Sequence, residues 1–254
     1  MISIDIISCL NDNYSYLLHD KKTNAVAIID PSDFNPCDQE IEKKHKKLDY
    51  IINTHHHFDH VGGNEELKKK YGAKVLGFEN DKDRIPGLDK GLKENENFKI
   101  GETSFKVIFV PGHTKGHVAF YSEQEKIIFT GDALFSLGCG RIFEGTYIDM
   151  FDSLKKIKNL PKKTKIYCGH EYTKNNFDFC NKYDTKNKNL SKKFDFINNK
   201  LNNNLPTIPV TLEDEINTNI FLRCDKSDIK MSLNMPEASE ELIFKKLRDL
   251  KDEF

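Results

Sequence analysis

The chain has 254 residues, enough for one large domain or a large and a small one, with a core that needs no disulfide staples. Its 39 basic and 40 acidic residues leave a net charge of -1, which gives no reason to expect binding to nucleic acid or to a membrane surface. Six cysteines are scattered without a C-x-x-C pair, and this favours reduced thiols in a reducing compartment over a disulfide framework.

Membrane segments and targeting signals are not expected. The N-terminal stretch MISIDIISCLNDNYSYLL lacks the basic start and apolar run of a signal peptide. No apolar stretch approaches the roughly 18 residues that a membrane-spanning helix needs. We therefore expect a soluble, cytoplasmic protein.

Short β-rich runs dominate the first two-thirds of the chain. They are ISIDII (2–7), YSYLL (14–18), AVAIID (25–30), LDYIIN (48–53), AKVLGF (73–78), SFKVIFV (104–110), HVAFY (117–121), KIIFT (126–130) and KIYC (165–168). Helices are predicted between some of them, over 64–71 and over 148–159, where apolar residues recur at helical spacing. This alternation predicts an α/β layered domain.

The pattern changes after Glu171. We predict no further strands there, and helices over 173–183, 187–203 and 237–250. Pro206, Pro209 and Pro236 interrupt this region because proline cannot continue a helix. The sequence therefore predicts two domains, one over 1–171 and a helical subdomain over 172–254.

Residues that can bind metal follow four of the predicted strands, in YIINTHHHFDH, VIFVPGH, IIFTGD and IYCGH. Loops at strand ends in layered α/β folds converge on functional sites. The candidate ligands are His55, His57, Asp59, His60, His113, Asp132 and His170.

The spacing within THHHFDH suggests two ion positions. His55 and His57 are two residues apart in an extended segment, so their side chains point the same way, whereas Asp59 and His60 lie past the turn. Seven ligands exceed the three or four that one tetrahedral ion needs. Asp132 is the natural bridge between two ions because a carboxylate has two oxygens.

Simpler interpretations apply to several of these residues. His113 or His170 alone would be an ordinary histidine, and Asp132 alone would be a turn residue after glycine. Four imidazoles within THHHFDH, in contrast, favour a metal site. His56 points away from its neighbours and is expected not to bind the ion. The remaining histidines, His19, His45 and His117, are expected to be structural.

These motifs resemble known ones. THHHFDH, PGHTKGH, FTGDALF and CGHEYT are similar to the metal-site motifs of the metallo-β-lactamase superfamily. This resemblance implies a four-layered αβ/βα sandwich for residues 1–171. GCGRIFEGT, YCGHEYTKNN, NIFLR and RDLKD resemble the glyoxalase II (hydroxyacylglutathione hydrolase) family, over essentially the whole chain and including the C-terminal helical subdomain.

Carried over position by position, the resemblance assigns roles to individual residues. It implies a first metal site of His55, His57 and His113, a second of Asp59, His60 and His170, and Asp132 as the bridge, with Asp59 and Asp132 as the catalytic carboxylates. It places glutathione contacts at Arg141, Phe143, Tyr172, Arg248 and Lys251.

Two of the glutathione positions depart from the family pattern. Arg141 stands where the family commonly has lysine; it keeps the charge, and a planar guanidinium still suits a carboxylate. Phe143 stands where the family has tyrosine, so its side chain cannot supply the hydrogen bond expected there. Arg248 and Lys251 are three residues apart and share a helix face that can hold an anionic ligand.

The implied activity is hydrolysis of S-(2-hydroxyacyl)glutathione, for example S-D-lactoylglutathione to D-lactate and glutathione, the second step of methylglyoxal detoxification. A hydroxide bridging two divalent ions is expected to be the nucleophile. Zinc is the expected metal, with iron or manganese as alternatives. The expected partner is this small-molecule thioester, without nucleic acid or membrane, and the expected state is a monomer or weak homodimer.

Two other functions compete with this one. One is another superfamily hydrolase or a persulfide dioxygenase with a single iron, against which the complete ligand set and the helical tail argue. The other is a metal-binding scaffold or nucleic-acid-binding relative without catalysis. Such a relative is disfavoured because all seven ligand positions match and no basic, aromatic-rich surface run is present.

Overall fold

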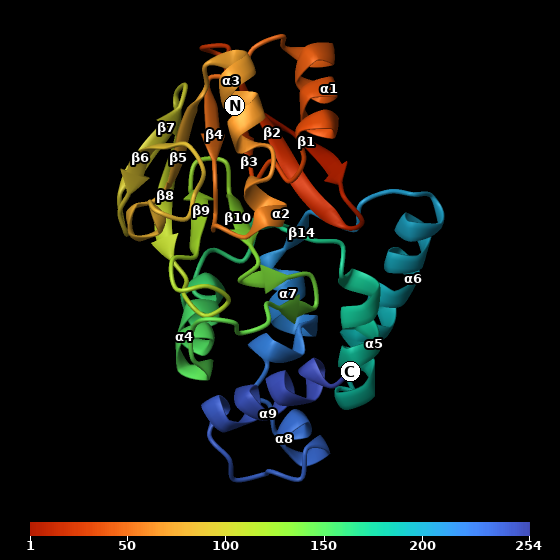
Figure 1. The fold of residues 1–254 in the computed structure, drawn as a ribbon. Helices are drawn as coiled ribbons and strands as arrows, with labels where there is room; N and C mark the ends of the chain where they lie inside the picture. Colours follow the sequence, from red (N-terminus) through yellow and green to blue (C-terminus); the bar gives the residue numbers. More distant parts are fainter. The chain divides into compact units, whose positions relative to one another are not determined.

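A computed structural model describes residues 1–254 (Figure 1). The strands are β1 (Ile2–Cys9), β2 (Asn13–Asp20), β3 (Ala25–Ile29), β4 (Tyr50–Ile52), β5 (Lys74–Phe78), β6 (Leu88–Leu92), β7 (Asn97–Ile100), β8 (Thr103–Phe109), β9 (Val118–Ser122), β10 (Ile127–Gly131), β11 (Leu134–Phe135), β12 (Gly138–Cys139), β13 (Lys165–Cys168) and β14 (Val210–Thr211). The helices are α1 (Phe34–Lys44), α2 (Phe58–Val61), α3 (Asn64–Tyr71), α4 (Tyr147–Lys158), α5 (Thr173–Tyr183), α6 (Lys188–Asn202), α7 (Leu212–Thr218), α8 (Ser227–Ser232) and α9 (Glu240–Asp252), with 3-10 turns η1 (Glu79–Asp81) and η2 (Ile220–Leu222). None of the helices combines the length and apolar character needed to cross a bilayer.

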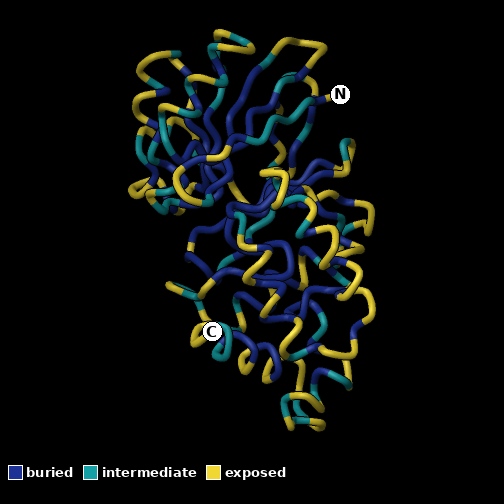
Figure 2. Tube along the Cα trace, turned by 90° about the vertical axis from the view of Figure 1, so that its right-hand side faces the viewer, coloured by how far each residue is buried: buried dark blue, intermediate teal, exposed yellow.

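The chain divides into two compact units. The N-terminal unit comprises Met1–Phe109 and Gly116–Gly131, and the C-terminal unit comprises Val110–Lys115 and Asp132–Phe254. Within both, strands and the inner sides of helices are buried, and many connecting loops are exposed (Figure 2).

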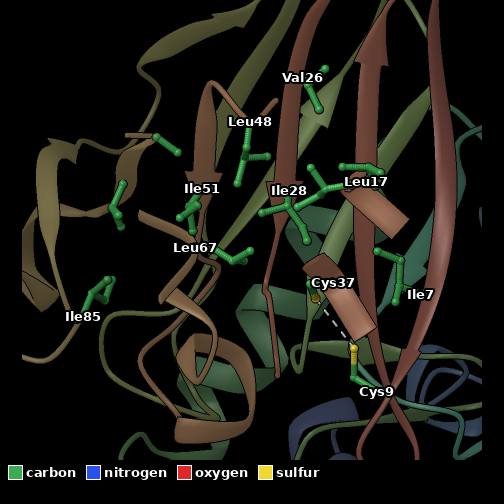
Figure 3. Close-up of a cluster of buried hydrophobic side chains, with 13 residues drawn as sticks. Ile7, Cys9, Leu17, Val26, Ile28, Cys37, Leu48, Ile51, Leu67 and Ile85 are labelled. Carbon is green, nitrogen blue, oxygen red and sulfur yellow. Dashed lines mark hydrogen bonds between the residues drawn. The ribbon is translucent and has the colours of Figure 1, made fainter. Parts of the chain in front are cut away.

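The first sheet of the N-terminal unit has the strand order β1-β2-β3-β4-β5-β6. The first three strands are antiparallel and the remaining pairs are parallel. Helices α1 and α3 lie along this sheet (Figure 1). Because side chains alternate across a strand, one set of apolar residues faces these helices. That set includes Leu17, Val26, Ile28 and Ile51 (Figure 3).

Two thiols lie within the same cluster. The sulfurs of Cys9 at the end of β1 and Cys37 in α1 are 3.9 Å apart and buried (Figure 3). All six cysteines of the chain are free and buried.

Strands β7 to β10 form an antiparallel meander in the same unit. It packs against the other face of the first sheet: the rings of Tyr16 in β2 and Phe129 in β10 are 5.2 Å apart, and those of Phe78 in β5 and Phe109 in β8 are 5.0 Å apart. The N-terminal unit is therefore a sandwich of two sheets with helices on the outside of the first.

The C-terminal unit is mainly helical. Helix α4 begins at a capping box, in which the side chain of Thr146 accepts from the Asp149 N–H and the Asp149 carboxylate accepts from the Thr146 N–H. Its Phe151 packs on Phe244 of α9, with ring centroids 5.6 Å apart. Helix α9 thus forms part of the core of this unit.

Each predicted strand run contains a strand, and helices 64–71 and 173–183 have the predicted bounds. The prediction of no strand after residue 171 is wrong, because Val210 in β14 pairs with Ile166 in β13. Two residues are too short for an alternating pattern to be visible. Helices α1, α2, α7 and α8 were not predicted.

Candidate metal centre

The THHHFDH segment connects β4 to α2, and its four candidate ligands lie close together in the N-terminal unit. The rings of His55 and His57 are 4.8 Å apart and those of His55 and His60 are 4.2 Å apart. Asp59 is fixed from the start of β2, where Asn13 Nδ2 donates to Asp59 Oδ2 (2.9 Å) and to the Asp59 carbonyl (3.0 Å).

Asp30, directly after β3, organises these ligands. It is buried, and its carboxylate accepts from the Thr54 N–H (2.8 Å) and from Thr54 Oγ1 (2.6 Å). His60 Nδ1 lies 3.0 Å from Asp30 Oδ2, and this ring nitrogen must be the donor because a carboxylate only accepts. Thr54 Oγ1 gives its proton to Asp30, so it can accept from His55 Nδ1 at 3.1 Å.

These bonds fix the tautomers of two histidines. In both His55 and His60 the proton is on Nδ1, and the lone pair is on Nε2, the nitrogen that would face an ion. His60 Nε2 lies 3.8 Å from Asp59 Oδ2. Two acceptors that face each other in this way would be stabilised by a cation between them.

Three further candidate ligands lie together in the C-terminal unit. Asp132 Oδ2 is 3.4 Å from His113 Nε2 and 3.2 Å from His170 Nε2, and all three residues are buried. The carbonyl of Arg141 accepts from His113 Nδ1 at 2.8 Å, which leaves the lone pair of His113 on Nε2. Here, too, an acceptor nitrogen faces a carboxylate oxygen.

The donor sets of both units suit divalent metal ions. Metal-binding histidines usually donate their other N–H to a carboxylate or carbonyl, as His60 and His113 do. Asp30 lies close enough to His55 and His60 to be a third ligand of one ion. We assign it a supporting role instead, because both of its oxygens already accept hydrogen bonds from Thr54 and His60.

Two histidines expected not to bind metal have other surroundings. His117 is buried and stacks on His55, with ring centroids 4.6 Å apart and an interplanar angle of 22°. His56 turns toward Asp81 and Arg84, with His56 Nδ1 3.3 Å from Asp81 Oδ2. Sequence reasoning identified neither Asp30 nor Asp81 as part of this region. The one available signal was that Asp30 ends a predicted strand, as Asp132 does.

The candidate glutathione residues belong to the C-terminal unit, and two of them share one carboxylate. Asp252 Oδ1 accepts from Arg141 Nε (3.1 Å) and from Arg248 Nη2 (2.8 Å). Arg248 is only 4% exposed, and its Nη1 also donates to the carbonyl of Cys139 at 2.9 Å. Arg141 is exposed. The structure therefore gives Arg248 several internal partners, which the sequence pattern did not indicate.

The other three candidates are all less buried than Arg248. Lys251 lies over the ring of Phe179 (5.3 Å), and burial lowers the pKa of its ammonium to about 8. Tyr172 is 37% exposed and stacks on the His170 ring, with centroids 4.6 Å apart. Phe143 is 60% exposed. Tyr172 thus connects a candidate metal ligand to the surface of its unit.

Comparisons with known proteins agree with this arrangement. Residues 11–170 match the protein-family model of the metallo-beta-lactamase superfamily. ETHE1 from Myxococcus xanthus superposes with a TM-score of 0.67 at 21% identity, covering 99% of this chain and 98% of that one. TTHA1623, solved in a di-iron-bound form, gives a TM-score of 0.55 at 26% identity over 66% of this chain and 91% of that one. The fold is the αβ/βα sandwich of metallo-β-lactamases, as predicted.

The comparisons that include the remainder of the chain identify a narrower family. Residues 171–254 match the model described as the hydroxyacylglutathione hydrolase C-terminus. The hydroxyacylglutathione hydrolase of Pelagibacter ubique is 52% identical and that of Methylococcus capsulatus 41% identical, with 100% of this chain and 100% and 99% of theirs covered. The chain belongs to the hydroxyacylglutathione hydrolase (glyoxalase II) family.

Proposed function

We propose that the protein hydrolyses the thioester of S-(2-hydroxyacyl)glutathione with the help of two divalent metal ions. The proposed first site is His55, His57 and His113, the second is Asp59, His60 and His170, and Asp132 is the bridge. This assignment across the two units rests on the family motifs. The observation that supports it most is that bonds to Asp30, Thr54 and the Arg141 carbonyl leave Nε2 of three of these histidines to face an ion.

Zinc is our proposal for the metal, because histidine and carboxylate donors suit it, although iron and manganese also accept such ligands. When bound, the ions would lower the pKa of water and stabilise the negative charge that develops on the thioester oxygen. The protein's own contribution is to hold the ligand tautomers and to orient the substrate. Its residues need not supply a general acid, since a thiolate with a pKa of roughly 8.5 leaves readily.

The helical subdomain over 172–254 is proposed to bind the glutathione part. In this subdomain Lys251 is partly exposed, and Arg141 in the preceding segment is exposed; both are cations, and the substrate has carboxylates far from the reacting carbonyl. Binding energy from these remote groups would orient the thioester. Tyr172 and Phe143 offer exposed rings beside His170 and His113, and Arg248 supports Cys139 and Asp252 from the interior.

A direct test combines three measurements on one preparation. We expect hydrolysis of S-D-lactoylglutathione, two metal ions per chain by elemental analysis, and no oxygen consumption with glutathione persulfide. Absence of thioesterase activity in metal-loaded protein would exclude the proposed reaction. Oxygen consumption with one iron per chain would favour the dioxygenase activity instead.

Lys251 should make substrate binding pH-dependent. Because its pKa is lowered to about 8, the ammonium is charged below that pH and neutral above it. A charge-assisted hydrogen bond contributes about 1.5–3 kcal/mol, so we expect KM to rise about tenfold or more once pH exceeds the pKa. The matched control is Lys251→Arg, because a guanidinium stays charged throughout this range. An identical rise of KM in that variant would show that another group titrates.

The location and assembly of the protein remain predictions. Six buried free thiols support a reducing compartment such as the cytoplasm. We propose a monomer or a weak homodimer, which sedimentation at two concentrations would distinguish.

A further inference from the structure

His56 is the central histidine of THHHFDH, yet its partners differ from those of the proposed ligands. Its Nδ1 lies 3.3 Å from Asp81 Oδ2, and Arg84 Nη1 lies 3.3 Å from His56 Nε2. Its side chain is 17% exposed. The ring of His57 is 5.0 Å away and is inclined at 61° to that of His56, so the two neighbouring rings meet edge to face.

Asp81 is itself held firmly. It ends η1, directly after β5, and its side chain is only 1% exposed. Arg84 Nη2 donates to Asp81 Oδ1 at 2.5 Å, and the Asp81 carbonyl accepts from the Arg84 and Ile85 N–H groups. A Cβ added at Gly116 would lie 2.0 Å from Asp81 Oδ1, so the backbone there packs directly on the carboxylate. A buried carboxylate with so little freedom can fix the position of its imidazole partner.

Because His55 and His57 are the chain neighbours of His56, fixing the position of His56 restricts theirs as well. His55 and His57 are bonded through the chain to His56 on either side, and they lie in a segment outside any strand or helix. Two backbone hydrogen bonds flank His55 and His56: the Thr54 carbonyl accepts from the Val118 N–H and the His57 carbonyl accepts from the His60 N–H. Side-chain contacts supply the remaining constraints. Asp30 and Thr54 hold one end of the segment, and Asp81 and Arg84 hold its middle.

We propose that Asp81 and Arg84 are positioning residues for the metal centre, which act through His56 by fixing the loop that presents His55 and His57. The inference rests on the proposed function only in taking His55 and His57 as ligands. It assigns a task to the one histidine of the motif that the ligand set omits. Outer partners of metal ligands typically change metal affinity by about 10- to 100-fold, and we expect the same range for Asp81→Asn.

The test is competition for zinc between the purified protein and a chelator, followed by elemental analysis. We expect Asp81→Asn to lose zinc at about 10- to 100-fold lower chelator concentration than the unmodified chain. Excess zinc should restore much of kcat, with KM for S-D-lactoylglutathione nearly unchanged. Arg84→Gln, at a more exposed position, tests the same contact if Asp81→Asn fails to fold.

A matched control separates positioning from general destabilisation. Asp20 is also a buried carboxylate of the N-terminal unit, and it accepts from the N–H groups of Lys22, Thr23 and Thr103, away from the histidine loop. Asp20→Asn should lower the unfolding temperature without shifting the chelator midpoint. An equal shift in this control would overturn the proposal.

A double-mutant comparison tests the route of action. If Asp81 acts through His56, then His56→Ala and His56→Ala/Asp81→Asn should have the same chelator midpoint, since coupled residues are not additive. Additive losses, or an unchanged midpoint in Asp81→Asn, would contradict the inference. The variant His57→Ala tests the proposed ligand set separately from the role of Asp81. If this variant retained its full zinc content, the proposed ligand set would be wrong.

Discussion

Replacing Asp132 by alanine is expected to remove bound metal and abolish most thioesterase activity. Its Oδ2 lies within 3.4 Å of the Nε2 atoms of both His113 and His170, so no other carboxylate of the C-terminal unit can take its place between them. Changing an outer partner of a ligand costs about 10- to 100-fold in metal affinity or activity, so loss of the proposed bridging ligand should lower kcat/KM by more than about a hundredfold. Elemental analysis and S-D-lactoylglutathione hydrolysis would measure both effects.

The control for this variant is Asp178→Ala. Asp178 is an exposed residue of α5 in the same unit and forms a surface salt bridge with Lys174, a type of pair that contributes little to stability. The Asp178→Ala variant should retain its metal and its thioesterase activity. An Asp132→Ala protein that still carried two ions per chain would disprove the bridging assignment.

Replacing Glu215 by alanine is expected to cause the largest loss of stability. Glu215 in α7 is fully buried and pairs with the buried Lys193 of α6, with Nζ and Oε1 2.7 Å apart. Its Oε2 accepts from the Leu137 N–H (2.7 Å) and from Asn219 Nδ2 (3.0 Å). Removing one partner of a buried ion pair costs about 3–5 kcal/mol, because the other charge is left uncompensated.

The backbone conformation of Leu137 adds to the loss of stability expected for Glu215→Ala. It lies in the turn between β11 and β12 with φ of 61°, a left-handed conformation that non-glycine residues rarely adopt. The bond to Glu215 stabilises this turn, which leads toward Arg141. Urea unfolding would measure the change in free energy, with Glu213→Ala as control because that glutamate is exposed on the same helix. A loss below about 1 kcal/mol would show that the pair contributes little.

The sequence predicted those parts of the molecule that local patterns determine. Helix α4 and the strand preceding THHHFDH follow from the spacing of apolar residues. Helix α1 was not predicted because Cys37 and Ile41 are its only buried residues and Pro36 lies in its first turn. Two buried residues in eleven are too few to produce a recognisable apolar stripe.

For the candidate site, the sequence identified residues that could bind metal but not their supports. Asp30 lies thirty residues before His60, and Asp81 lies twenty-five residues after His56, so no local pattern connects them. The shared carboxylate of Asp252 and the burial of Arg248 also depend on the packing of α9. Such contacts are products of tertiary structure, and only the folded chain reveals them.

The burial of the cysteines in the C-terminal unit has a chemical consequence for an enzyme that handles thioesters. Burial raises the pKa of Cys168 and Cys180 to about 12 and that of Cys139 and Cys224 above its usual range. Only a thiolate attacks a thioester or a disulfide, and these sulfurs stay protonated at neutral pH. These four cysteines are therefore shielded from acyl transfer and from mixed disulfides with glutathione, although Cys139 lies directly against Arg248.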